Sequence, residues 1–318
     1  MRERWERCSS SLACVIVVGG EALVDLVIDT EGRVVAKLGG GPFNSARAAA
    51  RLGSPVAFLG SLSRDRFGSS LRQMLLDDGV SDALVQFTEL PTTLAAAELD
   101  ADGSASYRFY ITDTSAPWMH PVTLPTDCTV LHLGTLGMVL EPMATVLEDT
   151  VRHVHDDTLV FLDPNCRPRV TRDREGYLER LELLAGRSDM VKVSTDDLEF
   201  LDPTNPAGAI ATLLEQGARC VLHTDGGRSV HVHVGGRSVE VAVPSVTVAD
   251  TIGAGDSFGG AMVAWWQQAG FGRAEVADIE LVAKAARDAV KVAAINCTRV
   301  GAQPPTRVEM QSDWNPGR

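Results

Sequence analysis

The chain has 318 residues, of which 45% are hydrophobic and 22% charged, a composition typical of a soluble globular protein with a large core. Its formal net charge of −13 argues against nucleic acid as a partner, because a phosphate backbone needs a basic surface. The longest apolar run, residues 12–28, contains Glu21, Asp25 and a glycine pair, so we predict no membrane span.

Six cysteines are scattered along the chain without CxxC spacing, which predicts neither a zinc site nor a disulfide framework. Residues 1–11 are charged, and the apolar run after them lacks a clean cleavage site. We therefore interpret residues 1–11 as an N-terminal extension without a signal peptide, and we expect a cytoplasmic protein.

Residues 13–110 contain two hairpin patterns. Strands are expected at 13–18, 22–28 and 33–38, and a second hairpin at 93–99 and 106–110. Asp25 lies inside the second strand, where a carboxylate is costly unless it is paired; an edge position that faces solvent is the alternative. Two hairpins among helices predict a small sheet separate from the core.

From residue 129 onward, strands and helices alternate. Strands are expected at 129–133, 158–162, 190–193 and 219–223, and helices at 141–155, 177–185, within 196–216 and at 280–294. This alternation predicts an α/β protein whose parallel sheet is covered by helices on both faces. Ligands of such sheets bind beyond the carboxyl ends of the strands, where polar groups follow at 163–167, 192–194 and 224–227.

Residues 248–262 are the most informative stretch. We expect a strand at 241–248 and a helix at 258–268, with Gly253-Ala254-Gly255 between them. Small residues allow backbone N–H groups to approach a ligand, and a helix N-terminus attracts anions. Asp256 would repel a phosphate, so it indicates a further role, either accepting a proton or holding a cation.

Three glycines at 39–41 precede a helix expected at 45–52, and again suggest close approach to a ligand, with a tightly packed turn as the alternative. A serine hydrolase would explain the G-x-S-x-G match at 255–259, but no histidine follows Ser257. There is neither a G-x-G-x-x-G after the first strand nor a P-loop, which argues against a dinucleotide-binding dehydrogenase and a P-loop NTPase.

Phosphoryl transfer fits these residues better. It needs an attacking hydroxyl group, a base for its proton, stabilisation of the transferring charge, and Mg²⁺ on the donor phosphates. Asp256 could be the base, and the N–H groups of 253–256 could stabilise the phosphoryl group. Asp25 and Asn44 could hydrogen-bond the hydroxyl groups of the substrate.

Residues 39–53, GGGPFNSARAAARLG, and residues 248–262, VADTIGAGDSFGGAM, resemble the two signatures of the ribokinase/PfkB family of sugar kinases. The similarity is collinear from about residue 15 to residue 305. It implies a ribokinase-like fold, with a central mostly parallel sheet flanked by helices and a small β-sheet lid. It also implies a single kinase domain over 12–318, with the lid built from about 22–38 and 93–110.

The resemblance implies ATP-dependent phosphorylation of a sugar hydroxymethyl group with Mg²⁺, and in some relatives K⁺. The catalytic residues it implies are Asp256 as the base and Gly253, Ala254 and Gly255 as the anion hole. The implied sugar contacts are Asp25, Gly40, Asn44 and Arg108. The implied nucleotide contacts are Lys192, Ser194, Thr224, Gly226 and Asn296. The implied metal contacts are Asp197 for Mg²⁺ through water, and Asp250 with the Ile252 carbonyl for K⁺.

Two loops depart from the family pattern. The N-x-x-E motif is replaced by residues 194–197, in which Asp197 is one methylene shorter than glutamate, and the T-x-G-x-x-G loop at 224–229 loses its last glycine.

Residues 107–110 and 114–116 resemble the fructokinase-like branch, so we expect a fructose-like substrate. Ribose, 2-keto-3-deoxygluconate and nucleosides are the alternatives, and so is a catalytically silent sugar- or nucleotide-binding protein. Open edges of the small sheet favour a homodimer through the lid.

Overall fold

The computed structural model describes residues 14–99 and 105–317. Within them, the main sheet has ten strands in the order β14-β13-β12-β11-β10-β9-β1-β4-β5, with β6 paired to β4. Its strands are β1 (Val15–Gly19), β4 (Val56–Ser63), β5 (Val80–Ser81), β6 (Val85–Thr88), β9 (Cys128–Gly134), β10 (Leu159–Asp163), β11 (Met190–Ser194), β12 (Cys220–Asp225), β13 (Ser229–Val234) and β14 (Arg237–Ala242).

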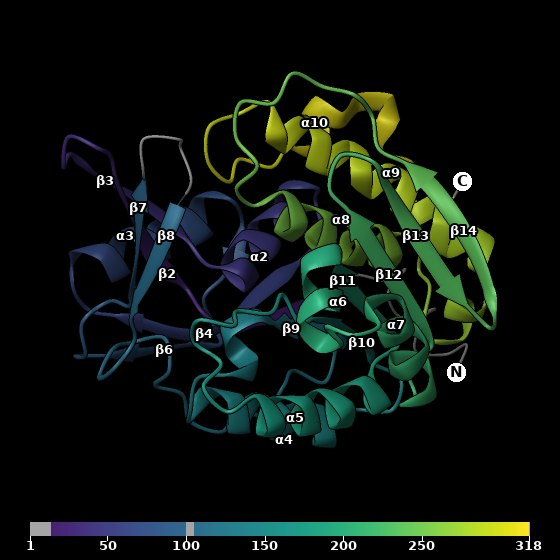
Figure 1. The fold of residues 1–318 in the computed structure, drawn as a ribbon, viewed down its shortest axis with the longest axis horizontal. Helices are drawn as coiled ribbons and strands as arrows, with labels where there is room; N and C mark the ends of the chain where they lie inside the picture. Colours follow the sequence, from purple (N-terminus) through teal and green to yellow (C-terminus); the bar gives the residue numbers. More distant parts are fainter. Residues whose placement is uncertain (1–13, 100–104, 318) are drawn as a thin grey trace.

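Helices cover both faces of this sheet, as Figure 1 shows with α8 and α9 above it and α4 and α5 below it. One face carries α2 (Gly41–Arg51), α3 (Arg66–Asp77), α8 (Ala254–Gln268) and α9 (Ile279–Cys297). The other face carries α4 (Met143–His153), α5 (Arg174–Arg187), α6 (Thr195–Leu201) and α7 (Pro206–Glu215). Shorter helical segments are η1 (Thr135–Met138), η2 (Ala274–Ala277), α10 (Arg307–Met310) and η3 (Gln311–Asp313).

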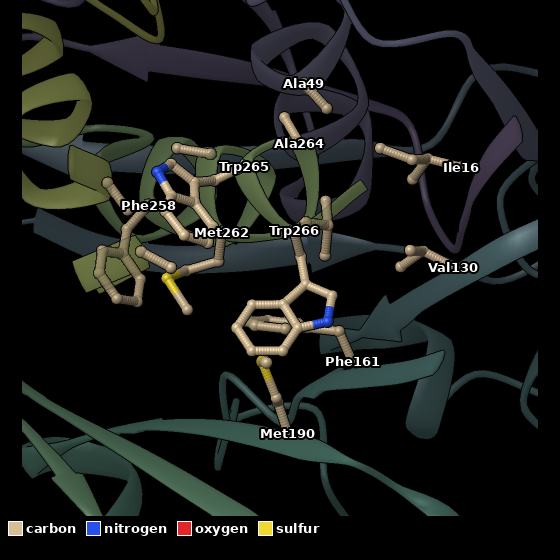
Figure 2. Close-up of a cluster of buried hydrophobic side chains, with 14 of the residues drawn as sticks. Ile16, Ala49, Val130, Phe161, Met190, Phe258, Met262, Ala264, Trp265 and Trp266 are labelled. Carbon is tan, nitrogen blue, oxygen red and sulfur yellow. The ribbon is translucent and has the colours of Figure 1, made fainter. Parts of the chain in front are cut away.

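The strands build two apolar layers because successive side chains point to opposite faces of a sheet. In β1, Ile16 and Val18 pack on the α8 side, while Val17 packs on the α4 side. Figure 2 shows the first layer, where Trp266 of α8 lies beside Phe161 and Met190 of the strands. Burial on both faces explains why most positions of the parallel strands are apolar.

A separate small sheet has the order β3-β2-β7-β8. Its strands are β2 (Leu23–Ile28), β3 (Val34–Gly39), β7 (Leu94–Leu99) and β8 (Ala105–Tyr110). The prediction of an α/β fold with a mostly parallel central sheet and a second, small sheet is therefore confirmed. Residues 1–11, predicted to be an extension, lie outside the described residues.

Three expectations are corrected. The strand expected at 241–248 ends at Ala242, because β14 is the last strand of an antiparallel β12-β13-β14 meander that the alternating pattern did not reveal. Helices α2 and α8 begin at Gly41 and Ala254, so Asn44 and Asp256 lie in first helical turns rather than in loops. Cys14 is disulfide-bonded, although the cysteine spacing predicted no disulfide framework.

Within the described residues, none of the helices has the length and apolar character needed to cross a membrane.

Candidate active site

The first turns of α2 and α8 meet and hold each other in place. Asn44 Nδ2 in α2 donates a hydrogen bond of 2.9 Å to Asp256 Oδ2 in α8, and Ser45 Oγ donates one of 3.1 Å to the Asp256 carbonyl oxygen. Each helix follows a glycine with positive φ, 119° at Gly40 and 74° at Gly253, a conformation that side chains disfavour. The predicted base and one predicted sugar ligand are thus direct neighbours.

The glycine turn at 39–41 brings the other predicted sugar residues to the same place. A Cβ atom on Gly39 would lie 3.0 Å from Asp25 Oδ2, and one on Gly41 would lie 3.4 Å from Asp256 Oδ1. A Cβ atom on Gly40 would lie 2.6 Å from the Glu21 carbonyl oxygen, which is too close. The turn therefore needs glycine, and Asp25, Asn44 and Asp256 surround it.

Asp25 does not occupy the solvent-facing edge that was the alternative. Its strand, β2, is paired on both sides, with β3 and with β7, and its side chain is partly buried. Burial raises the pKa of Asp25 to about 6, and the negative charge of Asp256 adds to that rise. The carboxyl group therefore lies on a strand paired on both sides, next to the glycine turn, rather than at a solvent-facing edge.

Asp256 is a partly buried acid with positive charges nearby. Burial raises its pKa above the usual range of an aspartate, and the hydrogen bond from Asn44 and the charges of Lys192 and Arg167 oppose this rise. A carboxylate with a raised pKa is a stronger base than one in water. The environment of Asp256 therefore suits proton acceptance.

Lys192 lies beside the predicted anion hole, in an ion pair with Asp163. Its Nζ is 3.0 and 3.1 Å from the two carboxylate oxygens of Asp163, and both residues are buried. Burial alone would lower the pKa of Lys192, but the carboxylates of Asp163, Asp197 and Asp256 outweigh it and raise that pKa. A Cβ atom on Gly255 would lie 3.2 Å from Lys192 Nζ, so a protonated ammonium group lies against the start of α8.

Asp197 is held almost completely by the protein. Its Oδ1 accepts a hydrogen bond of 2.6 Å from the Cys166 N–H, and its Oδ2 accepts bonds of 2.8 and 2.7 Å from the N–H and Oγ of Ser194. A carboxylate has about four acceptor sites, so about one remains free. This fits a contact with a metal-bound water and disfavours direct coordination, and the described residues contain no cluster of three metal-binding side chains.

The predicted nucleotide residues lie on β11, around the end of β12 and at the end of α9, and Lys192 and Ser194 are the two on β11. Thr224 is the second-last residue of β12, which ends at Asp225, and Gly226, with a φ of 55°, lies in the turn that follows. Asp225 between them forms an ion pair with Arg228, so the acid in this loop is neutralised. Asn296 is fully buried at the end of α9, where Nδ2 donates to the Ile252 carbonyl oxygen at 2.9 Å and Oδ1 accepts from the Gln303 N–H at 2.7 Å.

The predicted K⁺ ligand Asp250 already has a cationic partner. Its Oδ1 accepts from the Ile252 N–H at 3.0 Å, its Oδ2 accepts from the Gly301 N–H at 2.8 Å, and Lys37 Nζ of the small sheet lies 3.3 Å from Oδ2. The Ile252 carbonyl oxygen already accepts from Asn296. Asp250 therefore already has a positive charge beside it, supplied by the Lys37 ammonium group.

Arg108 is exposed on β8, opposite Ala96 of β7. Four further residues lie close to this site but were not predicted as site residues: Glu21, Asp163, Arg167 and Thr135. Asp163 and Arg167 belong to a polar cluster that was noted after a predicted strand, and this was a usable signal. Thr135, with a positive φ of 54° and a hydrogen bond from Asn165 Nδ2 at 3.3 Å, has no such signal in the sequence.

Comparison with known proteins identifies the family. The pfkB family carbohydrate kinase model matches residues 15–308. The fructokinase of Rhizobium leguminosarum bv. trifolii is 33% identical over 258 residues, covering 79% of each chain, and fructokinase-1 of Oryza sativa subsp. japonica is 31% identical over 315 residues, covering 93% of this chain and 96% of its own.

Solved structures agree. The Xylella fastidiosa fructokinase with bound ATP is 30% identical with a TM-score of 0.87, covering 95% of this chain and 98% of its own. A Vibrio cholerae fructokinase in fructose, ADP and calcium ion bound form shares the fold at 24% identity and a TM-score of 0.78, covering 95% and 99%. The protein is a phosphotransferase with an alcohol group as acceptor, and it belongs to the pfkB family of carbohydrate kinases.

Proposed function

We propose that the protein transfers the terminal phosphoryl group of ATP to a hydroxymethyl group of fructose. The observation that carries this proposal is the position of Asp256 at the start of α8. Its carboxylate accepts a hydrogen bond from Asn44 and lies next to the glycine turn at 39–41, which follows β3 of the small sheet. The similarity to fructokinases, one of them solved with ATP and another with fructose and ADP, supports the choice of donor and acceptor.

In this proposal Asp256 is the general base. Asn44 donates to Oδ2 and fixes the carboxylate, which leaves Oδ1 to accept the proton of the sugar hydroxyl group. Asp25 and Asn44 bind neighbouring hydroxyl groups and hold the attacking oxygen near Asp256. Gly40 allows the chain to approach the sugar closely, because no side chain lies in the way.

The start of α8 stabilises the transferring charge. The first turn of a helix has N–H groups without intrahelical partners; Ala254 N–H bonds to the Thr251 carbonyl oxygen, so the N–H groups of Gly255 and Asp256 remain for the phosphoryl group. Lys192 adds a full positive charge beside Gly255. Phosphoryl transfer depends mainly on positioning and charge stabilisation of this kind.

On the nucleotide side, bound Mg²⁺ would neutralise the donor phosphates, and Asp197 would hold one of its water ligands through the acceptor site that the protein leaves free. The turn of Thr224 and Gly226 would approach the phosphates, with Asp225 kept neutral in effect by Arg228. Lys192 and Ser194 hold Asp163 and Asp197 in place in this region. Asn296 links the loop after α9 to the turn before α8 through its hydrogen bonds with Gln303 and Ile252.

We further propose that residues 12–318 act as one kinase domain in the cytoplasm, with the small sheet as its lid and Arg108 as a lid contact to the sugar. Val34, Val35 and Tyr110 of this sheet expose large apolar side chains, which favours a homodimer through the lid.

A panel of sugars tests the function. Purified protein with ATP and Mg²⁺ is mixed with fructose, ribose, 2-keto-3-deoxygluconate and nucleosides, and ADP release is measured. We expect fructose to give the highest kcat/KM. Sugar binding by calorimetry without ADP release from any compound would instead indicate a catalytically silent binding protein.

We expect the rate to be independent of K⁺. Replacing K⁺ by Na⁺ or by a large organic cation should change kcat less than about twofold, because Lys37 already neutralises Asp250. Lys37→Met removes that charge and should make the rate respond to K⁺, whereas Lys284→Met, on α9, should not. Strong K⁺ activation of the unmodified protein would contradict this account.

A further inference from the structure

Glu21 is a buried acid next to the sugar site that the mechanism above does not use. It follows β1, and its side chain is 1% exposed. Its Oε1 accepts a hydrogen bond of 3.0 Å from the Gly41 N–H, the first residue of α2. Its Oε2 is buried and has no hydrogen-bond partner among the described residues.

These contacts connect Glu21 to the catalytic residues through the glycine turn. Gly41 lies between Glu21 and Asp256, since its N–H bonds to Glu21 and a Cβ atom on it would lie 3.4 Å from Asp256 Oδ1. The Glu21 main chain also lies against Gly40, since a Cβ atom on Gly40 would be 2.6 Å from the Glu21 carbonyl oxygen. A change in the charge of the Glu21 carboxyl group would therefore affect the glycine turn of the predicted sugar site and Asp256, the predicted base.

The surroundings favour the neutral form of Glu21. Burial raises its pKa to about 8; hydrogen bonds from backbone N–H groups oppose that rise, the negative charge of Asp256 on α8 adds to it, and Arg167, after β10, opposes it. Because Glu21 Oε2 has no hydrogen-bond partner among the described residues, an ionised Glu21 would be a second negative charge beside Asp256. The two acids are thus compatible when Asp256 is ionised and Glu21 keeps its proton.

We propose that Glu21 is a neutral positioning residue of the sugar site: its protonated carboxyl group holds the Gly41 N–H, and its ionisation at alkaline pH switches phosphoryl transfer off. The inference rests on the proposed function. Ionised Glu21 would repel the negative phosphoryl group at the moment when Asp256 accepts the sugar proton, and it would leave an unpaired charge beneath the glycine turn.

Glu21→Gln separates charge from shape. Glutamine keeps the acceptor for the Gly41 N–H and the size of the protonated acid, but it cannot ionise. We expect kcat of the unmodified protein to fall about tenfold between pH 8 and pH 9.5, as for loss of one essential proton. Glu21→Gln should lose this alkaline decline and keep near-normal kcat at pH 7, while Glu175→Gln, an exposed control on α5, should retain the decline.

Glu21→Ala distinguishes positioning from filling space. It leaves the Gly41 N–H without its acceptor, so we expect KM for the sugar to rise at least tenfold at pH 7. Glutamine should rescue that loss, because it restores the acceptor. An alkaline decline that persists in Glu21→Gln would overturn the proposal.

Thermal unfolding tests the protonation state without relying on activity. Below about pH 4.5 both the folded and unfolded forms of Glu21 are protonated, and between that value and about pH 8 only the folded form keeps its proton. Stability from Glu21 is therefore lost as pH rises through this window, and glutamine removes the loss. We expect the Tm of Glu21→Gln relative to the unmodified protein to rise by about 5–10 °C from pH 5 to pH 8.

The unfolding and turnover measurements distinguish failure of the Glu21 proposal from failure of the proposed function. A constant Tm difference across this range would overturn the neutral Glu21, whether or not the protein phosphorylates fructose. Absence of sugar turnover together with the expected Tm change would overturn the proposed function and leave the protonation of Glu21 supported.

Discussion

Replacing Asp256 by asparagine is expected to lower kcat by about three powers of ten, because general bases contribute about 10²–10⁴ to such reactions. Asparagine keeps an oxygen that can accept the hydrogen bond from Asn44. The sugar dissociation constant should therefore change by less than about threefold, as expected when an interaction made in the transition state is lost. Steady-state rates and calorimetry on the same preparation give both quantities.

The control is Glu280→Gln, which removes an exposed carboxylate from the first turn of α9. It should leave kcat unchanged within about a factor of two. A near-normal rate in Asp256→Asn would show that Asp256 is not the base. Weakened sugar binding at unchanged kcat would show that Asp256 acts in binding the sugar and not in the chemical step.

The unmodified protein and Asp256→Asn are expected to differ in the acid limb of the pH–rate profile, which is the rise of the rate with pH on its acidic side. The base must be ionised to act, and burial raises the pKa of Asp256, so the rate of the unmodified protein should rise with pH across that raised pKa. The residual rate of Asp256→Asn should lack this limb. Equal acid limbs in the two proteins would contradict the assignment.

Lys192→Met is expected to be the most destabilising of these substitutions, at about 3–5 kcal/mol, because it leaves the buried Asp163 carboxylate without its cation. It should also lower kcat, since the ammonium group beside Gly255 is lost. Denaturant unfolding measures the first effect, and turnover below the unfolding range measures the second.

Lys192→Met combined with Asp163→Leu removes both charges and should recover much of the stability but not the activity. Lys291→Met is the matched control, because the Lys291–Asp288 pair is partly exposed and should cost only about 0–1 kcal/mol. An unfolding midpoint of Lys192→Met equal to that of the unmodified protein would show that the ion pair does not hold this part of the fold.

The sequence predicted the parallel core because each buried strand is a short apolar run between helical segments. It failed at 241–248, where an apolar run continues beyond β14, since hydrophobicity alone cannot tell an extended loop from an edge strand. The starts of α2 and α8 were placed too late because glycines have low helix propensity, although Pro42 fits the first turn of a helix.

The sequence also predicted which residues meet at Asp256, because the two glycine-rich signatures resemble a known family. It did not predict the partners that decide their chemistry. Lys37 is 213 residues from Asp250, and Lys192 is 29 residues from Asp163. Such pairs depend on the sheet order, and the orphaned oxygen of Glu21 depends on packing around the glycine turn, so neither follows from local pattern.

Product analysis tests the central claim most directly. The protein is incubated with fructose, ATP and Mg²⁺, ADP and sugar phosphate are both quantified, and phosphorus–proton correlation NMR locates the phosphate. The account predicts one sugar phosphate for each ADP, with the phosphate on a CH₂ carbon of fructose, and loss of both products in Asp256→Asn. ADP formed without sugar phosphate, or phosphate on a ring CH carbon, would contradict it.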